Sequence, residues 1–137
     1  MNYWIIALPR EAMVHCIKIG VFGRSQKAGV CNVREGDKVA CYVTKESKLV
    51  AFGKATSDYY MDDSPVFLSG GVFPDRFRFT AKCLSKNEEI DFKSLINDLE
   101  FITNKFYWSA FFKQGIKRIS ENDWSLIWER RSQISER

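Results

Sequence analysis

Apolar residues at the start of the chain predict a strand followed by a helix. Residues 3–8 form a continuous apolar run that is too short for a helix, which is typical of a strand buried on both faces. Pro9 suits the first turn of a helix, Met13 and Cys16 follow at helical spacing, and Gly20 is a common helix-ending residue. The pattern therefore predicts a buried strand and then a short amphipathic helix that ends at Gly20.

Two further strands follow, joined by a tight turn. A turn over 34–37 leads into residues 38–44, where apolar positions alternate, and residues 45–48 predict the turn into a return strand over 49–56. Gly53 interrupts the return strand, and a glycine inside a strand indicates a bulge or a close approach of another backbone.

Residues 58–75 are rich in turn formers and predict a long connection. The connection still contains four aromatic residues: Tyr59, Tyr60, Phe67 and Phe73. A disordered segment rarely contains so many rings. We therefore expect this connection to pack on the body of the protein and to line part of its surface.

Residues 76–84 alternate most cleanly and predict a strand with one exposed, basic face. That face carries Arg76, Arg78, Thr80 and Lys82, and the opposite face carries Phe77, Phe79, Ala81 and Cys83. Cys83 is in register with two phenylalanines, so a buried thiol is expected there, as it is for Cys41 between two valines.

The last third of the chain predicts a short helix, a closing strand and a final helix. Asp91 can cap the short helix, and residues 115–119 predict the strand. Ser120 and Asp123 resemble a capping box that opens the last helix. Trp124 and Trp128 share a face of that helix, so both rings are expected to be buried against the sheet.

The order of these elements predicts one α+β domain over residues 1–137. Its expected architecture is a strongly bent mixed sheet, or partial barrel, flanked by helices, with the first strand central. A chain of 137 residues that is 45% hydrophobic can bury one sizeable core. No apolar run approaches the roughly 20 residues of a membrane helix, so no membrane association is expected. The cysteines lack CxxC spacing, which favours reduced thiols and a cytoplasmic location.

The charge is unevenly distributed along the chain. The formal net charge is +4, with a balance of +4 over residues 1–60, −3 over 61–100 and +3 over 101–137. If both ends fold onto one face, that face would be basic enough to meet phosphate groups. Scattered charge that only keeps the protein in solution explains the same numbers.

The groups needed for hydrolytic or redox catalysis are scarce. His15 is the only histidine, and it adjoins Cys16 on a predicted helix, where consecutive side chains do not face each other. The sequence contains no phosphate-binding loop, dinucleotide fingerprint or HExxH motif, and no spacing that supports a metal site. Binding is therefore expected rather than catalysis, without a cofactor or metal.

Ordered segments over almost the whole chain resemble the EVE domain, a member of the PUA-like superfamily that is related to YTH domains. The matching residues are 3–6, 20–23, 33–38 and 95–99, together with Phe101, Ile102, Asn104, Lys105, Trp108, Ser109 and Phe112. The resemblance implies a PUA-like β pseudo-barrel, no catalytic activity, and a cavity that accepts a flipped or modified base, such as a modified cytosine in DNA.

The resemblance also implies which residues bind the base. An aromatic residue, usually Trp, forms a pocket wall in relatives at the position of Phe22, and the small residue after it, here Gly23, supplies backbone polar groups. A second aromatic stretch near the cavity is matched by Trp108, Ser109, Phe111 and Phe112. Gly53 is expected to leave room beside the pocket, and Arg24, Lys27, Arg76 and Arg78 are expected to line its rim and to contact phosphates.

Some positions depart from the family pattern. Relatives often carry polar side chains where this chain has Leu8, Pro9 and Ala12, and these three cannot donate hydrogen bonds to a base. The expected function is a non-enzymatic module that binds DNA or RNA and recognises a modified base. The alternative is a domain that binds a nucleotide or another small molecule, or that acts as a protein adaptor.

Overall fold

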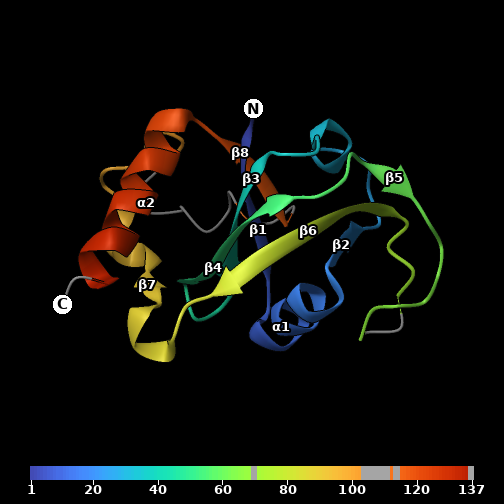
Figure 1. Cartoon of the computed structure of the whole chain (residues 1–137), viewed down its shortest axis with the longest axis horizontal. Helices are drawn as coiled ribbons and strands as arrows, with labels where there is room; N and C mark the ends of the chain where they lie inside the picture. The colour runs from blue at the N-terminus through green and yellow to red at the C-terminus, as the bar shows by residue number, and fades with distance from the viewer. Residues whose placement is uncertain (69–70, 103–111, 113–114, 136–137) are drawn as a thin grey trace.

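A mixed β-sheet with one helix on each face forms the body of the protein (Figure 1). The computed structural model describes residues 1–68, 71–102, 112 and 115–135. Its helices and strands are β1 (Tyr3–Leu8), α1 (Arg10–Ile19), β2 (Val21–Arg24), η1 (Val30–Asn32), β3 (Lys38–Val43), β4 (Lys48–Ala55), β5 (Tyr60–Met61), β6 (Asp75–Cys83), η2 (Lys86–Glu88), β7 (Ile90–Asp91), η3 (Phe92–Leu95), β8 (Ile116–Ile119) and α2 (Glu121–Ser135). Among the described residues, no helix is both long enough and apolar enough to span a bilayer.

The strands follow the order β2-β6-β4-β3-β1-β8. β1 pairs in parallel with β3 and antiparallel with β8, so it is an interior strand but lies toward one end of the order. The short strand β5 pairs with the start of β6, and β7 pairs with the start of β4. This curled, mixed α+β architecture confirms the predicted PUA-like fold class.

Alternating side chains of the strands supply two separate cores. On β1, Trp4 and Ile6 join the cluster under α1, which includes Met13. Ile5 and Ala7 point the other way and join the cluster under α2. Because successive strand residues face opposite sides of a sheet, the unbroken apolar run of β1 serves both cores at once.

The turns and caps agree closely with the sequence. Gly20 ends α1 with a φ of 72°, and its N–H donates to the Cys16 carbonyl at 2.8 Å. The Ser120 hydroxyl accepts from the Asp123 N–H at 3.1 Å, as the predicted cap requires. The Asp123 carboxylate, however, turns away from the cap and accepts from the N–H groups of Glu100 and Phe101, at 2.7 and 3.1 Å.

Gly53 marks a close approach of two backbones, one of the two predicted alternatives. A Cβ built on Gly53 would lie 1.7 Å from the Thr80 carbonyl oxygen of β6. The register shift between β3 and β4 occurs elsewhere, between Cys41 and Tyr42. Gly53 is therefore required by the spacing of β4 and β6.

The structure adds one strand and corrects two expectations. Residues 21–24 form strand β2, which the short apolar stretch did not predict. Trp128 is 41% exposed, although Trp124 is buried as expected. Phe52 of β4 contacts both rings, and Trp124 also packs against Tyr3 of β1. Cys83 is exposed because it lies at the last position of β6, beyond the covered part of the strand.

Candidate functional site

Phe22 and Phe112 lie on opposite faces of the sheet, so the structure does not bring these two predicted pocket residues together. Phe22 is fully buried under α1, where its ring centroid lies 5.6 Å from that of Phe77. Phe112 belongs to the core under α2 and stacks on Tyr42 at 4.2 Å. The other predicted pocket residues of that stretch, Trp108, Ser109 and Phe111, lie outside the described residues.

Gly23 lies under the connection that joins β5 to β6. A Cβ built on Gly23 would come within 2.6 Å of Cζ of Phe67 and 2.8 Å of the Phe73 carbonyl oxygen. The rings of Phe67 and Phe73 meet edge to face, with centroids 5.5 Å apart, and both are partly exposed. Because residue 23 has no side chain, aromatic rings can approach the backbone of β2 directly.

Arg76 holds this connection from below and is buried, although it was expected at an exposed rim. Its Nε donates to the Phe73 carbonyl at 3.0 Å, and its Nη2 donates to the carbonyls of Ser64 and Val72 at 2.5 and 2.7 Å. The Asp62 carboxylate lies 3.7 Å from its Nη1. The alternating pattern did predict the strand, but burial of Arg76 depends on a segment that folds over it.

The guanidinium of Arg76 also packs on an aromatic ring. Its Cζ lies 4.9 Å from the centroid of Phe67, within the range of a cation–π contact. Phe67 is therefore enclosed by the Gly23 backbone, the edge of Phe73 and the buried cation. We call this group of four residues, Gly23, Phe67, Phe73 and Arg76, the Phe67 site.

The other predicted rim cations differ in their degree of exposure. Arg24 is partly buried and donates to the Ala28 carbonyl at 2.7 Å. Burial lowers the pKa of Arg24, and the nearby Asp75 carboxylate acts in the opposite direction. Lys27 and Arg78 are exposed, and the Arg78 guanidinium lies 5.5 Å from the ring centroid of Tyr60.

A tyrosine and a buried carboxylate fix the end of the connection beside β2. The Tyr59 hydroxyl donates to Asp75 at 2.5 Å, and this hydrogen bond raises the pKa of Tyr59 to about 12. Asp75 is buried, and its backbone lies directly opposite that of Arg24 in the register of β2 and β6. The hydrogen bond therefore ties Tyr59 to the start of β6.

A groove of about 820 Å³ lies between α2 and the neighbouring strands, away from the Phe67 site. Its lining residues are Lys38, Phe52, Gly53, Lys54, Thr80, Ala81, Lys82, Trp124, Ser125, Trp128 and Glu129. Gly53 thus lines a concave surface, but it shares that surface with α2 and not with Phe22 or Gly23. We call this surface the α2 groove.

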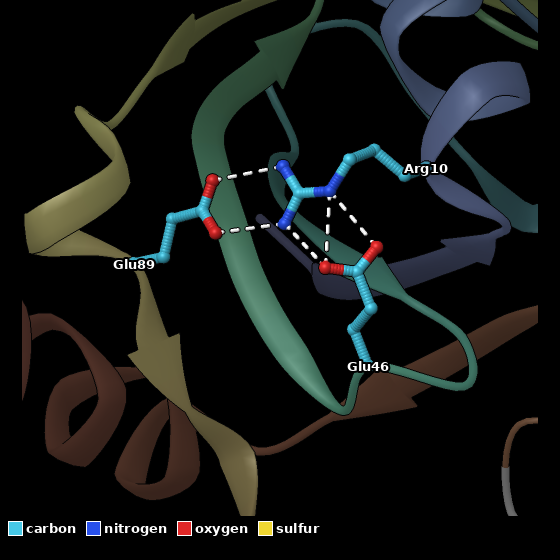
Figure 2. Close-up of polar contacts among 3 residues, drawn as sticks. All are labelled: Arg10, Glu46 and Glu89. Atoms are coloured by element: carbon cyan, nitrogen blue, oxygen red, sulfur yellow. Dashed lines mark hydrogen bonds and ion pairs between the residues drawn. The ribbon is translucent and has the colours of Figure 1, made fainter.

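Arg10 is a cation that the structure already neutralises. Its guanidinium donates to both carboxylate oxygens of Glu46 and of Glu89, at 2.8 to 3.1 Å (Figure 2). The bonds to Glu89, and then those to Glu46, raise the pKa of Arg10. The trio ties the start of α1 to the β3–β4 turn and to the segment before β7, so its role here is structural.

The residues with thiol and imidazole groups do not form a pair. The His15 Nε2 atom lies 2.8 Å from the Val66 carbonyl oxygen, so the ring contacts the β5–β6 connection. Burial raises the pKa of the Cys16 thiol to about 11, which keeps it protonated near neutral pH. The contacts of His15 thus hold the connection against α1.

The sequence predicts the aromatic residues of the Phe67 site but not the α2 groove. The aromatic content of residues 58–75 was the signal for Phe67 and Phe73, and their packing on the body confirms that expectation. The α2 groove was missed because Trp124 and Trp128 were both assigned to the core. Their spacing defines a shared stripe but does not show where the sheet beneath that stripe ends.

Comparisons with known proteins identify relatives over most of the chain. No family model matches it. The UPF0310 protein PH1033 of Pyrococcus horikoshii is 36% identical over 141 residues, covering 93% of this chain and 97% of the relative. The UPF0310 protein PYRAB08750 of Pyrococcus abyssi is 30% identical over the same length, with the same coverage.

Solved structures with low sequence identity share the fold. Rpa0253 from Rhodopseudomonas palustris superposes with a TM-score of 0.69 at 13% identity, covering 97% of this chain and 94% of that one. An Mmi1 YTH domain superposes with a TM-score of 0.67 at 10% identity, covering 99% of this chain and 91% of that one. The predicted relation to YTH domains is confirmed at the level of the fold.

Proposed function

The chain belongs to the UPF0310 family, and we propose that this member is a non-enzymatic nucleic-acid-binding module that recognises a modified base. One arrangement carries the proposal: the Phe67 ring lies against the Gly23 backbone and over the Arg76 guanidinium. A flat ring is thus already held between a backbone and a cation at the edge of the sheet. The fold shared with the Mmi1 YTH domain supports the same function.

The chemistry of the Phe67 site suits a base that has been rotated out of its stack. Such a base needs aromatic surfaces for stacking and polar groups for its edge. Phe67 and Phe73 provide partly exposed rings on which a base can stack. Phe67 takes the role first expected for Phe22, because the Phe22 ring has no exposed surface.

Cations on β2, on β6 and in the loop after β2 are suited to bind the phosphates of a nucleic acid. Lys27 and Arg78 are exposed, and Arg24 is partly exposed. Phosphate contacts position a nucleic acid but carry no base information. The proposal therefore assigns base discrimination to the rings and affinity to the three cations.

Binding to a panel of oligonucleotides tests the proposal. The panel holds single strands and duplexes that carry one modified base or none, measured at two salt concentrations. The substitution Phe67→Ala is expected to weaken binding of the preferred modified strand about tenfold, since stacking contributes roughly 1 to 3 kcal/mol per base. Phe101→Ala, which removes a partly buried ring elsewhere, is the matched control.

The cation variants separate the two roles. Arg24→Ala and Lys27→Ala are expected to weaken modified and unmodified strands alike and to flatten the salt dependence. Equal losses for both strands on removing Phe67 would contradict base recognition at this site. Failure to bind any nucleic acid at low salt, with binding of free nucleotides or other small molecules, would support the small-molecule alternative.

A further inference from the structure

We propose that the α2 groove is a second binding site and that its occupant is an unpaired segment of nucleic acid. The groove lies between α2 and strands β3, β4 and β6, apart from the Phe67 site. The inference goes beyond recognition of a modified base, because an unmodified strand would bind here through its phosphates and its stacking faces.

Lysines at the floor of the groove indicate an anionic occupant. Lys38 and Lys54 are direct partners across β3 and β4, so their side chains emerge on the same face. Like charges in directly opposed positions destabilise a sheet. Within the part of the chain that the structure describes, the ion pairs involve neither of these lysines nor Lys82.

Cations outnumber anions among the residues that line the groove, which also favours an anionic occupant. Lys82 pairs with Phe52 across β4 and β6 and adds a third cation beside the first two. Glu129 is the one acidic residue among the described lining residues. A phosphate that neutralises the opposed lysines would remove a repulsion that the folded protein otherwise retains.

Aromatic rings form the wall opposite the lysines. Trp128 is 41% exposed and stacks on Trp124, with ring centroids 6.2 Å apart and planes inclined by 17°. Phe52 meets both indoles edge to face, at 5.9 and 5.7 Å. The guanidinium of Arg131, which is not among the lining residues, lies 3.9 Å from the centroid of Trp128 and helps to hold that ring in place. Bases stack on such a wall regardless of their sequence.

Size and chemistry together favour an unpaired strand over a duplex. A volume of about 820 Å³ lies within the range of 300 to 1,000 Å³ that is typical of small-ligand pockets, so single nucleotides fit. Bases in a duplex are already stacked and paired, and their faces cannot reach an indole wall. A duplex would use only the lysines and would leave the aromatic surface exposed.

One strand connects the two sites, a step that rests on the proposed function. Arg76, Arg78 and Lys82 occupy alternate positions of β6 and therefore share a face of that strand. β6 begins beside β2 and β5 and runs toward α2 (Figure 1). From Arg76 to Lys82 the strand covers about 20 Å, at roughly 3.3 Å per residue. A nucleic acid held at Phe67 would therefore continue past Arg78 into the groove.

Fluorescence anisotropy with an unmodified, labelled single strand tests the inference, with the matching duplex and a mononucleotide as separate probes. Lys38→Gln and Lys54→Gln are each expected to weaken binding of the single strand. Each is also expected to reduce the steepness of the plot of log binding constant against log salt concentration, by about 0.7 for each phosphate contact that is lost. Trp128→Ala is expected to lower affinity for the single strand roughly tenfold with little effect on the duplex. Lys18→Gln, at an exposed position on α1, is the matched control.

Two rescue variants guard against a loss of fold. Lys54→Arg and Trp128→Phe keep the charge and the ring, and both are expected to retain most of the binding. Duplex binding that equals single-strand binding, a mononucleotide that binds as tightly as the oligonucleotide, or no effect of the groove variants would each overturn the inference. If modified and unmodified strands bind equally well while the groove variants still weaken single-strand binding, only the proposed function is refuted.

Discussion

The ring of Phe67 fills the space that a side chain at Gly23 would occupy. A Cβ at residue 23 would lie 2.6 Å from Cζ and 2.9 Å from Cε2 of Phe67, well inside normal contact. The backbone of β2 and the connection before β6 are therefore fitted to each other at this point. The fit depends on two residues far apart in the sequence, so it can be tested by changing both.

We expect Gly23→Ala to lower the free energy of unfolding by about 1 to 3 kcal/mol, the usual cost of overpacking. In a Phe67→Ala background the same change is expected to cost less, because the ring that it would displace is gone. The Phe73 carbonyl oxygen, 2.8 Å from the added atom, remains, so some cost persists. Urea unfolding of the wild type, both single variants and the double variant measures the coupling. Strictly additive effects would show that the two residues are not in contact.

Arg76 and Arg78 occupy alternate positions of one strand and are expected to differ sharply in their contribution to stability. Arg76 is 1% exposed and donates to three backbone carbonyls, which Arg76→Gln would leave without their charged partner. Since hydrogen bonds to a charged group contribute about 1.5 to 3 kcal/mol, we expect a loss of about 3 kcal/mol or more. Arg78→Gln, at an exposed position, is expected to cost less than about 1 kcal/mol. If urea unfolding shows that Arg76→Gln and Arg78→Gln lower the free energy of unfolding equally, the burial of Arg76 is contradicted.

Tyr59 should titrate well above an ordinary tyrosine. Folding raises the pKa of its phenol from about 10 to about 12, so the folded state favours the protonated form. The stability from this hydrogen bond is therefore fully present below pH 10 and is lost as the pH rises through about 12. Tyrosinate absorbance of wild type minus Tyr59→Phe is expected to have its midpoint near pH 12. A midpoint near pH 10 would contradict the hydrogen bond to Asp75, and Tyr60→Phe should leave the high-pH component in place.

Local patterns predicted most of the strands, because apolar alternation and turn residues act within a few positions of each other. The alternation of residues 76–84 predicted β6, and the glycine at 53 predicted either a bulge or a close backbone approach, of which the close approach is observed. β2 was missed because only Val21 and Phe22 are buried among its residues. Two apolar residues are too few to establish a period.

The sites were predicted less well, because each depends on which distant segment covers a given surface. Arg76 and Arg78 look alike in the sequence, yet only Arg76 lies under the connection that carries Phe67. Phe22 and Phe112 are both aromatic and both near the expected pocket in the family pattern, but Phe22 lies in the core under α1 and Phe112, which is not in a strand, lies in the core under α2. The periodicity of apolar residues shows which face of a helix or strand a residue lies on, but it does not show which segment packs against that face.

The four cysteines should react with a thiol reagent at very different rates in the native protein. Cys83 is exposed, Cys31 is partly buried, and Cys16 and Cys41 are buried, all with free thiols. Burial raises the pKa of Cys16 to about 11 and raises that of Cys41 as well, so both lack the thiolate that reacts. We expect one fast phase that Cys83→Ser removes, a slower phase that Cys31→Ser removes, and labelling of Cys16 and Cys41 only after unfolding. Fast labelling of Cys16 or Cys41 in folded protein would show that the core under α1, which holds both thiols, opens far more readily than its packing implies.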